Sequence, residues 1–201
     1  MKISTLDALR ALYAPARERS VRKQMSALDP HARRFIGLSP FVVLASHSSA
    51  GLPDASPRGG EPGFVKVLDP QTLLLPDSPG NNRLDTLENI VDSGQLGLLF
   101  LVPGIDETLR VNGRASLTTD PDRLALFADT RRPPKLLIEI QVAEVYLHCA
   151  KALMRSALWD PASRVDRAVL PSMGEMMKDQ IGGDAPAETQ EQMLARYAQD
   201  L

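Results

Sequence analysis

Three basic side chains fall at positions in the sequence where a charge needs an explanation. Arg58 follows a predicted extended segment and precedes two glycines, in SPRGG, and Lys66 lies inside the apolar run FVKV. Arg83 follows PGNN and falls in the predicted first turn of a helix over 83–93. Burying a lone cation is costly unless an anion answers it, and a helix N-terminus favours anions. We therefore expect the three side chains to meet in space and to bind a phosphate group.

Each of these positions also has an ordinary structural explanation. Arg58 alone is typical of a surface arginine, and Lys66 can run along an edge strand until its ammonium reaches solvent. Arg83 is the most informative of the three, because the positive end of a helix dipole disfavours a cation in the first turn. The sequence contains no phosphate-binding loop of the Walker or dinucleotide type beside these cations. The glycine-rich stretch GGEPG, over 59–63, has the residue spacing of neither motif.

The elements around these residues are short apolar strands separated by turns rich in Gly, Pro and Asp. Strands are predicted over 41–46, 55–58, 64–67, 72–75, 97–102, 108–117 and 137–148. One helix is predicted over 83–93, with Asn81 or Asn82 as its cap, and another after Asp120-Pro121. Six or seven antiparallel strands of this kind favour an α+β fold, mainly β, in which a barrel carries flanking helices.

The chain divides into three parts. Residues 1–37 are predicted to form helices that pack on the barrel, residues 38–160 form the barrel, and residues 161–201 form a helical, Met-rich tail. The first part carries an excess of basic residues and the last an excess of acidic ones. These charges belong either to two solvated helix surfaces or to a basic arm that touches an acidic arm, for instance across a dimer.

Composition argues against several functions. The formal net charge is −2 and the pI is about 5.9, which gives no nucleic-acid footprint. No apolar run approaches the length of a membrane span, and the first residues lack the apolar core of a signal peptide. The single cysteine, Cys149, fits a reducing compartment, so we expect a cytoplasmic protein. His31, His47 and His148 are not spaced as metal ligands, so no metal is expected.

Two sequence blocks carry a resemblance to a known family. They are PGNNR, over 79–83, followed by a helix and a buried apolar strand, and a CxKAxxRSxLW block over 149–159. With the order of elements over 38–160, they resemble a bacterial subgroup of the pyridoxamine 5′-phosphate oxidase-like FMN-binding split-barrel family. The resemblance implies a split β-barrel that binds FMN in the groove between the two subunits of a homodimer. Dimerisation also has a reason of its own, because the apolar strands 41–46 and 97–102 need cover on an outer face.

The resemblance also implies which residues bind the cofactor. The matching positions are Arg58, Lys66, Leu75, Pro76, Asp77, Asn82, Arg83, Thr108, Lys151, Arg155, Ser156 and Trp159. By the resemblance, residues 75–77 line the ring at a strand end, Asn82 donates beside the cations, and Thr108 reaches the flavin from the second subunit. Residues 151–159 close over the cofactor, with Trp159 either stacked on the flavin or plugging the barrel end. Only the three cations are supported independently, by their charge.

The chemistry implied by the resemblance is hydride or electron transfer at a flavin, with a small substrate that the sequence does not identify. A cation near the pyrimidine edge stabilises the anionic reduced flavin, and Lys66 or Lys151 is expected in that role. The acidic tail stands where the true oxidases have an arginine-rich end, so pyridoxamine phosphate is not the expected substrate. The alternatives are a flavin-binding protein without turnover, such as a sensor, a store or a partner-docking module, and a barrel that binds haem or a deazaflavin.

Overall fold

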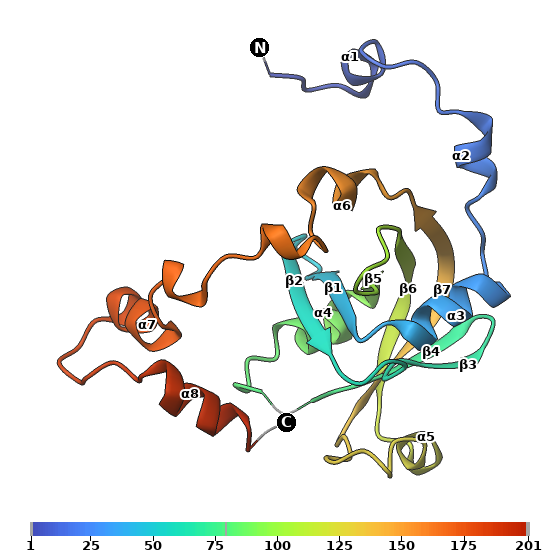
Figure 1. Ribbon diagram of the computed structural model, residues 1–201. Helices are drawn as coiled ribbons and strands as arrows, with labels where there is room; N and C mark the ends of the chain where they lie inside the picture. The colour runs from blue at the N-terminus through green and yellow to red at the C-terminus, as the bar shows by residue number, and fades with distance from the viewer. Residues whose placement is uncertain (1, 79, 200–201) are drawn as a thin grey trace.

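The computed structural model describes residues 2–78 and 80–199, and its centre is one antiparallel β-sheet (Figure 1). The strands are β1 (Phe41–His47), β2 (Pro53–Gly59), β3 (Lys66–Asp69), β4 (Thr72–Pro76), β5 (Gln95–Leu101), β6 (Thr108–Thr118) and β7 (Leu137–His148). Their order across the sheet is β2-β1-β5-β6-β7-β4-β3. β2 and β3 are therefore the edges of a curled sheet that is not closed, and the predicted antiparallel split barrel is confirmed.

Helices flank the sheet, and several of them begin at a side chain that accepts a backbone N–H. They are α1 (Leu6–Arg10), α2 (Glu18–Arg22), α3 (Pro30–Leu38), α4 (Asp85–Ser93), α5 (Pro121–Ala125), α6 (Lys151–Ser156), α7 (Met173–Ile181) and α8 (Gln190–Tyr197). Asp120 caps α5 by accepting hydrogen bonds from the amides of Asp122 and Arg123. The next residue is Pro121, so the helix predicted after Asp120-Pro121 is confirmed.

The helix predicted to include Arg83 begins two residues later than expected. α4 starts at Asp85 and has no side-chain cap, so the prediction that Asn81 or Asn82 caps it is wrong. A turn explains the difference: Asn82 is left-handed (φ 58°), and Asn81 Oδ1 accepts a hydrogen bond from the Arg83 amide at 3.0 Å. Asparagine is enriched in this conformation and in such side-chain turns. Arg83 consequently lies in a loop ahead of the helix.

Aliphatic side chains on one face of the sheet form the core. Along β1 and β5 every second residue is buried, so that Leu44 pairs with Leu98 and Val42 with Phe100 on the inner face. α3 and α4 contribute apolar side chains to the same core. The alternation fixes the register, and it places Arg58 of β2, which pairs with Val42, on the inner side of the sheet.

The N-terminal segment contacts the barrel through its later part. Met25 pairs with Val145 by two backbone hydrogen bonds of 3.0 and 2.8 Å, and Lys23 Nζ donates to the carbonyl of Leu147 at 2.6 Å. α3 buries side chains, whereas α1 and α2 bury none and arch away from the sheet in Figure 1. Packing on the barrel, which we expected for the helices of residues 1–37, is thus seen for α3 and not for α1 and α2.

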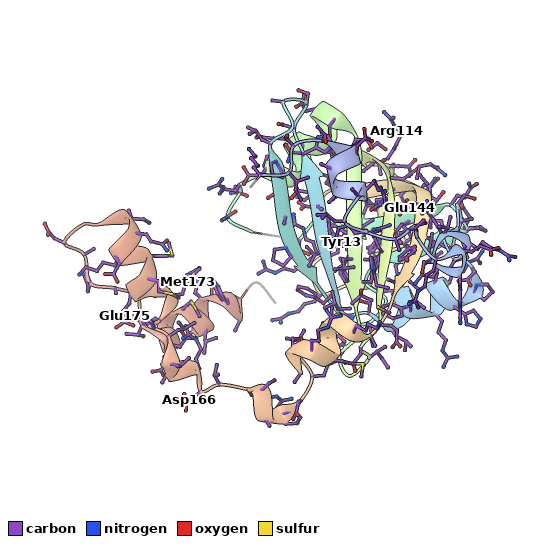
Figure 2. All side chains as sticks on the ribbon, turned by 90° about the horizontal axis from the view of Figure 1, so that it is seen from above. Tyr13, Arg114, Glu144, Asp166, Met173 and Glu175 are labelled. Carbon is purple, nitrogen blue, oxygen red and sulfur yellow. The ribbon has the colours of Figure 1, made fainter. Side chains whose placement is uncertain are left out.

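The C-terminal helices α7 and α8 form a hairpin at one side of the sheet (Figure 2). Two short 3₁₀ turns, Pro161–Ser163 and Arg167–Val169, lead from α6 to this hairpin. Gly174 of α7 packs closely against the segment that leads into α8, because a Cβ there would overlap the carbonyl oxygen of Glu188. The predicted helical, Met-rich tail is therefore a compact pair of helices.

The β-bulge at Asn112 and Gly113 provides a test of the sheet packing. A Cβ added at Gly113 would overlap the carbonyl oxygen of Gln141 on β7, where two backbones meet. Gly113→Ala should therefore lower the free energy of unfolding by about 1–3 kcal/mol in urea denaturation. Gly37→Ala is the matched control, because no atom lies within 4 Å of a Cβ built at Gly37. Equal unfolding midpoints for Gly113→Ala and the wild type would contradict this packing.

Candidate functional site

A pocket of about 1430 Å³ lies where the two unpaired edges of the sheet face each other. Its walls come from β2, the loop between β2 and β3, the start of β3, the end of β4, the segment before α4, the loop after α5 and the end of α8. The lining side chains with polar or charged groups include Asp54, Ser56, Arg58, Glu61, Lys66, Asp77, Ser78, Asn81, Arg83, Asp85, Thr86, Arg131, Arg132 and Arg196. Because β2 and β3 do not pair, side chains from both edges reach this pocket.

The three cations of the sequence analysis all line this pocket. Arg58 comes from β2, Lys66 is the first residue of β3, and Arg83 lies in the loop before α4. The fold thus brings together three positive charges that are separate in the sequence. The same lining also contains carboxylates, among them Asp77 and Asp85, so the ability to bind an anion depends on which cations these acids leave unpaired.

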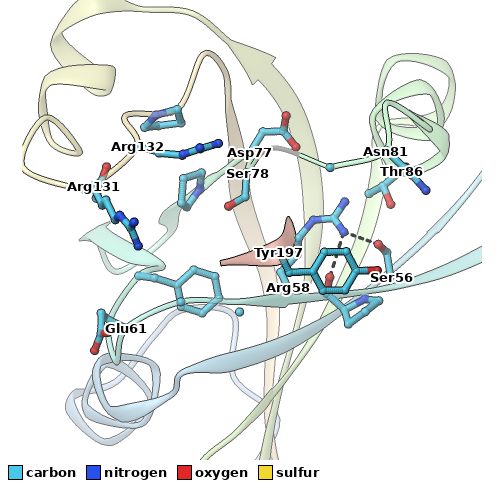
Figure 3. A pocket seen from close by; sticks show the side chains of 18 of the residues that line it. Ser56, Arg58, Glu61, Asp77, Ser78, Asn81, Thr86, Arg131, Arg132 and Tyr197 are labelled. Carbon is cyan, nitrogen blue, oxygen red and sulfur yellow. Dashed lines mark hydrogen bonds between the residues drawn. The ribbon is translucent and has the colours of Figure 1, made fainter. Parts of the chain in front are cut away.

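Arg58 is oriented by its own strand. Its Nη1 donates to the hydroxyl of Ser56 and to the carbonyl oxygen of Pro57, the latter at 3.0 Å (Figure 3). Within the described part of the chain, its other guanidinium N–H groups have no hydrogen-bond partner. Arg58 is therefore held at the pocket wall with donors to spare.

Lys66 is half-buried, and its stem lies against the second core cluster of the protein. Its Nζ is 5.1 Å from the centroid of the Phe127 ring, a cation–π contact. Phe127 packs with Leu74 and Leu137 in that cluster. No carboxylate among the described residues forms an ion pair with the ammonium of Lys66, so its positive charge faces the pocket without a counter-ion from the protein.

Arg83 is the most exposed of the three cations and already has a carboxylate partner. Its Nε donates to Asp85 Oδ2 at 2.9 Å, and its side chain is 75% exposed. This hydrogen bond and the charge of Asp85 raise the pKa of Arg83 above its ordinary value. The helix-dipole argument made from the sequence does not apply, because Arg83 precedes α4, but its position at the pocket remains.

Asp77 adds a half-buried acid beside these cations. Its amide donates to the carbonyl of Leu136 at 3.0 Å, which continues the contact of β4 with β7 and fixes the backbone at the pocket. Burial raises the pKa of the Asp77 carboxyl above its ordinary value, and the positive charge of Arg58 opposes this rise only in part. The site therefore holds a carboxyl whose ionised form is disfavoured.

A buried polar network fixes the wall formed by β2 and α4. Thr86 Oγ1 donates to Asp54 Oδ2 at 2.7 Å, and Asn89 Nδ2 donates to the hydroxyl of Ser46 at 3.0 Å. Thr86 and Ser46 are almost fully buried, so these bonds are protected from water. The network ties the start of α4 to β1 and β2, and it positions the preceding loop that carries Arg83.

The remaining predicted residues of the strand end and the PGNNR turn are only partly in the pocket. Pro76 and Asp77 line it, whereas the side chain of Leu75 is fully buried in the core and leaves only its backbone for contact. Asn82 is exposed and is not among the lining residues, and its neighbour Asn81 lines the pocket instead. The donor role expected for Asn82 stays a prediction, and the left-handed turn at Asn82 places its neighbour Asn81 in the pocket lining.

A second group of predicted residues lies outside this pocket: Thr108, Lys151, Arg155, Ser156 and Trp159. Thr108 opens β6 opposite His148 at the end of β7, and α6 follows directly after that strand. Trp159 Nε1 donates to the carbonyl of Ile105 at 2.9 Å, which fastens the segment after α6 to the loop before β6. Within one chain, the 149–159 block does not close over the pocket.

Polar side chains gather beside Thr108 on the outer face of β6 and β7. Arg110 forms an ion pair with Glu144 and lies 5.1 Å from the centroid of the Tyr146 ring, while Lys23 Nζ lies 4.3 Å from the same centroid. Burial lowers the pKa of His148, and the charges of Arg110 and Lys23 lower it further. This region adds positive charge next to the block that lies outside the pocket.

Several pocket residues were not found by sequence reasoning. Arg131 and Arg132 lie in the loop after α5, and their RRPP run is the one visible signal that could have marked them. Arg196 and Tyr197 come from α8, far along the chain, and no motif distinguishes them. Residues of this kind reach a site through tertiary structure alone.

The described residues provide neither a cluster of metal ligands nor a membrane-spanning helix. No group of three His, Cys, Asp or Glu side chains in residues 2–78 and 80–199 is arranged to hold a metal ion. In the same residues, no helix combines the length and the hydropathy that crossing a membrane requires.

Comparisons with known proteins agree with this architecture. The family model for pyridoxamine 5′-phosphate oxidase matches residues 28–149. HupZ from group A Streptococcus superposes with a TM-score of 0.50 at 17% identity, over 60% of this chain and 93% of that chain. An FMN-binding protein from Syntrophomonas wolfei gives a TM-score of 0.45 at 13% identity, over 58% and 82% of the two chains. At 17% identity the likeness to HupZ shows the fold alone, and no curated protein matches the sequence.

Asp77→Asn tests the half-buried carboxyl. Because burial raises the pKa of Asp77, the ionised carboxylate destabilises the folded state at a pH above that raised value. The amide carries no charge, so the variant should have a higher urea midpoint than the wild type at neutral pH. The difference should vanish as the pH falls below 3.8, the ordinary pKa, because the carboxyl is then protonated in both states.

Asp69→Ala is a control that should change the urea midpoint in the opposite direction. The Gln71 amide, which donates to the Asp69 carboxylate, lowers the pKa of Asp69, so removing this carboxylate should lower the midpoint at neutral pH. A fall in the midpoint for Asp77→Asn as well would show that the ionised Asp77 stabilises the protein, contrary to our assignment.

Proposed function

This chain belongs to the pyridoxamine 5′-phosphate oxidase family, and on that premise we propose that it is an FMN-binding flavoprotein that works as a homodimer. The observation that carries the proposal is the meeting of Arg58, Lys66 and Arg83 in one pocket at the open edges of the sheet. The single cysteine, Cys149, is exposed and forms no disulfide, which supports a reducing, cytoplasmic location.

The donors of this pocket fit a phosphate group. Arg58 has guanidinium N–H groups without a partner among the described residues, and Lys66 has no ion pair there. Charge-assisted hydrogen bonds from such groups to phosphate are about twice as strong as neutral ones. Arg83 is bound to Asp85 in exposed surroundings, where an ion pair contributes little, so a phosphate can replace that partner. We assign the phosphate to Arg58 and Lys66, with Arg83 at the rim.

The rest of the pocket suits a planar ring with polar edges. Phe64, Pro62 and Pro76 supply apolar lining, and the strand end at Asp77 presents backbone and carboxyl groups. The volume of about 1430 Å³ exceeds the roughly 300–1,000 Å³ that is usual for a ligand pocket. The excess supports a small second molecule beside the ring, as an oxidoreductase requires.

FMN, when bound, supplies hydride or electron transfer. The contribution of the protein is orientation and charge. Lys66 places a positive charge at the pocket, where it holds the phosphate and so orients the ring. Asp77, whose pKa is raised by burial, keeps a proton to higher pH than an exposed carboxyl does. We therefore propose oxidoreductase activity on a small substrate, with Asp77 as the side chain nearest to the chemistry.

The outer face of the sheet supports a second copy of this chain as partner. Phe41 pairs with Leu101 across β1 and β5, and Val43 pairs with Leu99, on the side opposite to the core. Phe41 is 37% exposed, and the other three are partly exposed. A continuous apolar patch on a sheet needs cover, and a two-fold partner provides it with the same patch.

Such a dimer gives a role to the residues that lie outside the pocket. Thr108 and the 149–159 block surround one end of β6 and β7, and a single chain leaves them away from the cations. In the proposed dimer, these residues of one copy complete the pocket of the other. Lys151 can add positive charge to the cofactor site only in this way.

The proposed site is tested by titrating FMN into the wild type and Arg58→Ala. Loss of a charge-assisted phosphate contact should raise the dissociation constant about 10- to 100-fold. Arg83→Ala should have a smaller effect, because Arg83 is exposed and already paired. Arg10→Ala, in α1 and outside the pocket, is the matched control and should bind FMN like the wild type.

The absorbance spectrum of the protein as purified decides between the possible ligands. A flavin spectrum that NAD(P)H or a small substrate bleaches supports the oxidoreductase, whereas a flavin that nothing reduces supports a non-catalytic flavoprotein. A haem or deazaflavin spectrum, or an unchanged FMN affinity in Arg58→Ala, would refute the proposed site.

The dimer is tested by Leu99→Asp on the outer face. A carboxylate in the middle of the apolar patch should dissociate the dimer, which light scattering would show as a halved mass, and should weaken FMN binding in parallel. Val91→Asp is the control, because Val91 is 75% exposed on α4, away from this face. A wild-type protein that is monomeric at all concentrations and still binds FMN would contradict the dimer.

A further inference from the structure

The C-terminal helix α8 forms one side of the pocket. Arg196 and Tyr197 are lining residues of the same pocket as Arg58, and Figure 3 shows Tyr197 among them. Arg132, which also lines the pocket, donates through Nη2 to the carbonyl oxygen of Gln199, just beyond the helix. The end of the chain is thus held at the pocket by a loop of the barrel, although the rest of the hairpin stands apart.

Contacts inside the α7–α8 hairpin fix the position of α8 within it. A Cβ at Gly174 of α7 would overlap the carbonyl oxygen of Glu188, so α7 lies close against the segment that leads into α8. Arg196 forms an ion pair with Glu188 at 2.8 Å, and its guanidinium lies 4.7 Å from the centroid of the Tyr197 ring. Met193 is 7% exposed, so α8 has a buried anchor. These contacts orient Tyr197 before any ligand is present.

Few buried residues connect the α7–α8 hairpin to the barrel. Residues 160–171 are exposed throughout and contain only two short 3₁₀ turns. Apart from Met193, no described residue of α7 or α8 is buried. Segments with few buried contacts open at low cost in free energy. The hairpin is therefore free to leave and rejoin the pocket as a body.

Resting on the proposed function, we infer that α8 is a movable wall of the flavin pocket and that Tyr197 covers the bound flavin. Tyr197 is 39% exposed and lines the same pocket as Arg58, so it has surface that a ring system can cover. Tyrosine offers a flat apolar face and a polar tip, which suits an isoalloxazine ring. The wall opens to admit FMN and closes on it, with the Arg132 contact to Gln199 as its latch.

Tyr197→Ala, Tyr197→Phe and the wild type, each as the full chain, test this inference by FMN titration and by the fluorescence of the bound flavin. Tyr197→Ala should raise the dissociation constant about tenfold and increase the fluorescence, because a stacked aromatic ring both stabilises and quenches a π-system. Tyr197→Phe keeps the ring and should resemble the wild type. Tyr13→Ala, at a tyrosine that is 68% exposed and outside the pocket, should change neither quantity.

Gly174→Ala provides a second variant, which displaces α8 without touching Tyr197. Its Cβ would overlap the carbonyl oxygen of Glu188, just ahead of α8, so its dissociation constant for FMN should rise as that of Tyr197→Ala does. Unchanged affinity and fluorescence in Tyr197→Ala would overturn the inference while leaving the FMN site intact. Tighter binding in that variant would also overturn it, because α8 would then be an obstacle. A wild type that binds no flavin would instead refute the proposed function, and this inference with it.

Discussion

Repulsion between like charges at an unclosed sheet edge is the constraint on which this structure depends. Arg58 and Lys66 lie on β2 and β3, the two edge strands, which do not pair with each other. Arg83 lies on the loop that precedes α4. Asp85 forms an ion pair with Arg83, whereas the described residues give Lys66 no ion pair and leave guanidinium N–H groups of Arg58 without a hydrogen-bond partner, so a bound anion would compensate these two charges. If β2 and β3 paired, these edges would satisfy each other's backbone groups and leave no room for a ligand. The unpaired edges thus leave the pocket that we propose as the binding site.

The pocket has one wall that buried hydrogen bonds fix and one wall that few buried contacts tie to the barrel. On one side, the buried bonds of Thr86 and Asn89 to Asp54 and Ser46 fix α4 against β1 and β2. On the other side, α8 reaches the pocket on a hairpin that few buried contacts tie to the barrel. A fixed wall suits recognition of a phosphate, whose donors must keep their geometry, and a mobile wall suits exchange of a large ligand. In the proposed dimer, the apolar outer face would bind a second copy, whose residues would complete the pocket.

The sequence predicted what depends on local pattern and missed what depends on contacts distant along the chain. β7 has the predicted bounds, Leu137–His148, because alternation of apolar and polar residues is a local property. The meeting of the three cations followed from their chemistry. The start of α4 was misplaced because a side-chain turn at Asn81 competes with the helix. Tyr197 escaped notice because only the folded hairpin brings it to the pocket, and the exposure of α1 and α2 was not visible in their apolar spacing.

The central claim is that a phosphate answers the three cations, and calorimetric titration with FMN and with riboflavin tests it most directly. The two ligands share the isoalloxazine ring and differ in the phosphate, so the comparison isolates that group. FMN should bind at least about tenfold more tightly than riboflavin, and added salt should reduce this difference in affinity. Equal dissociation constants for the two ligands would contradict it.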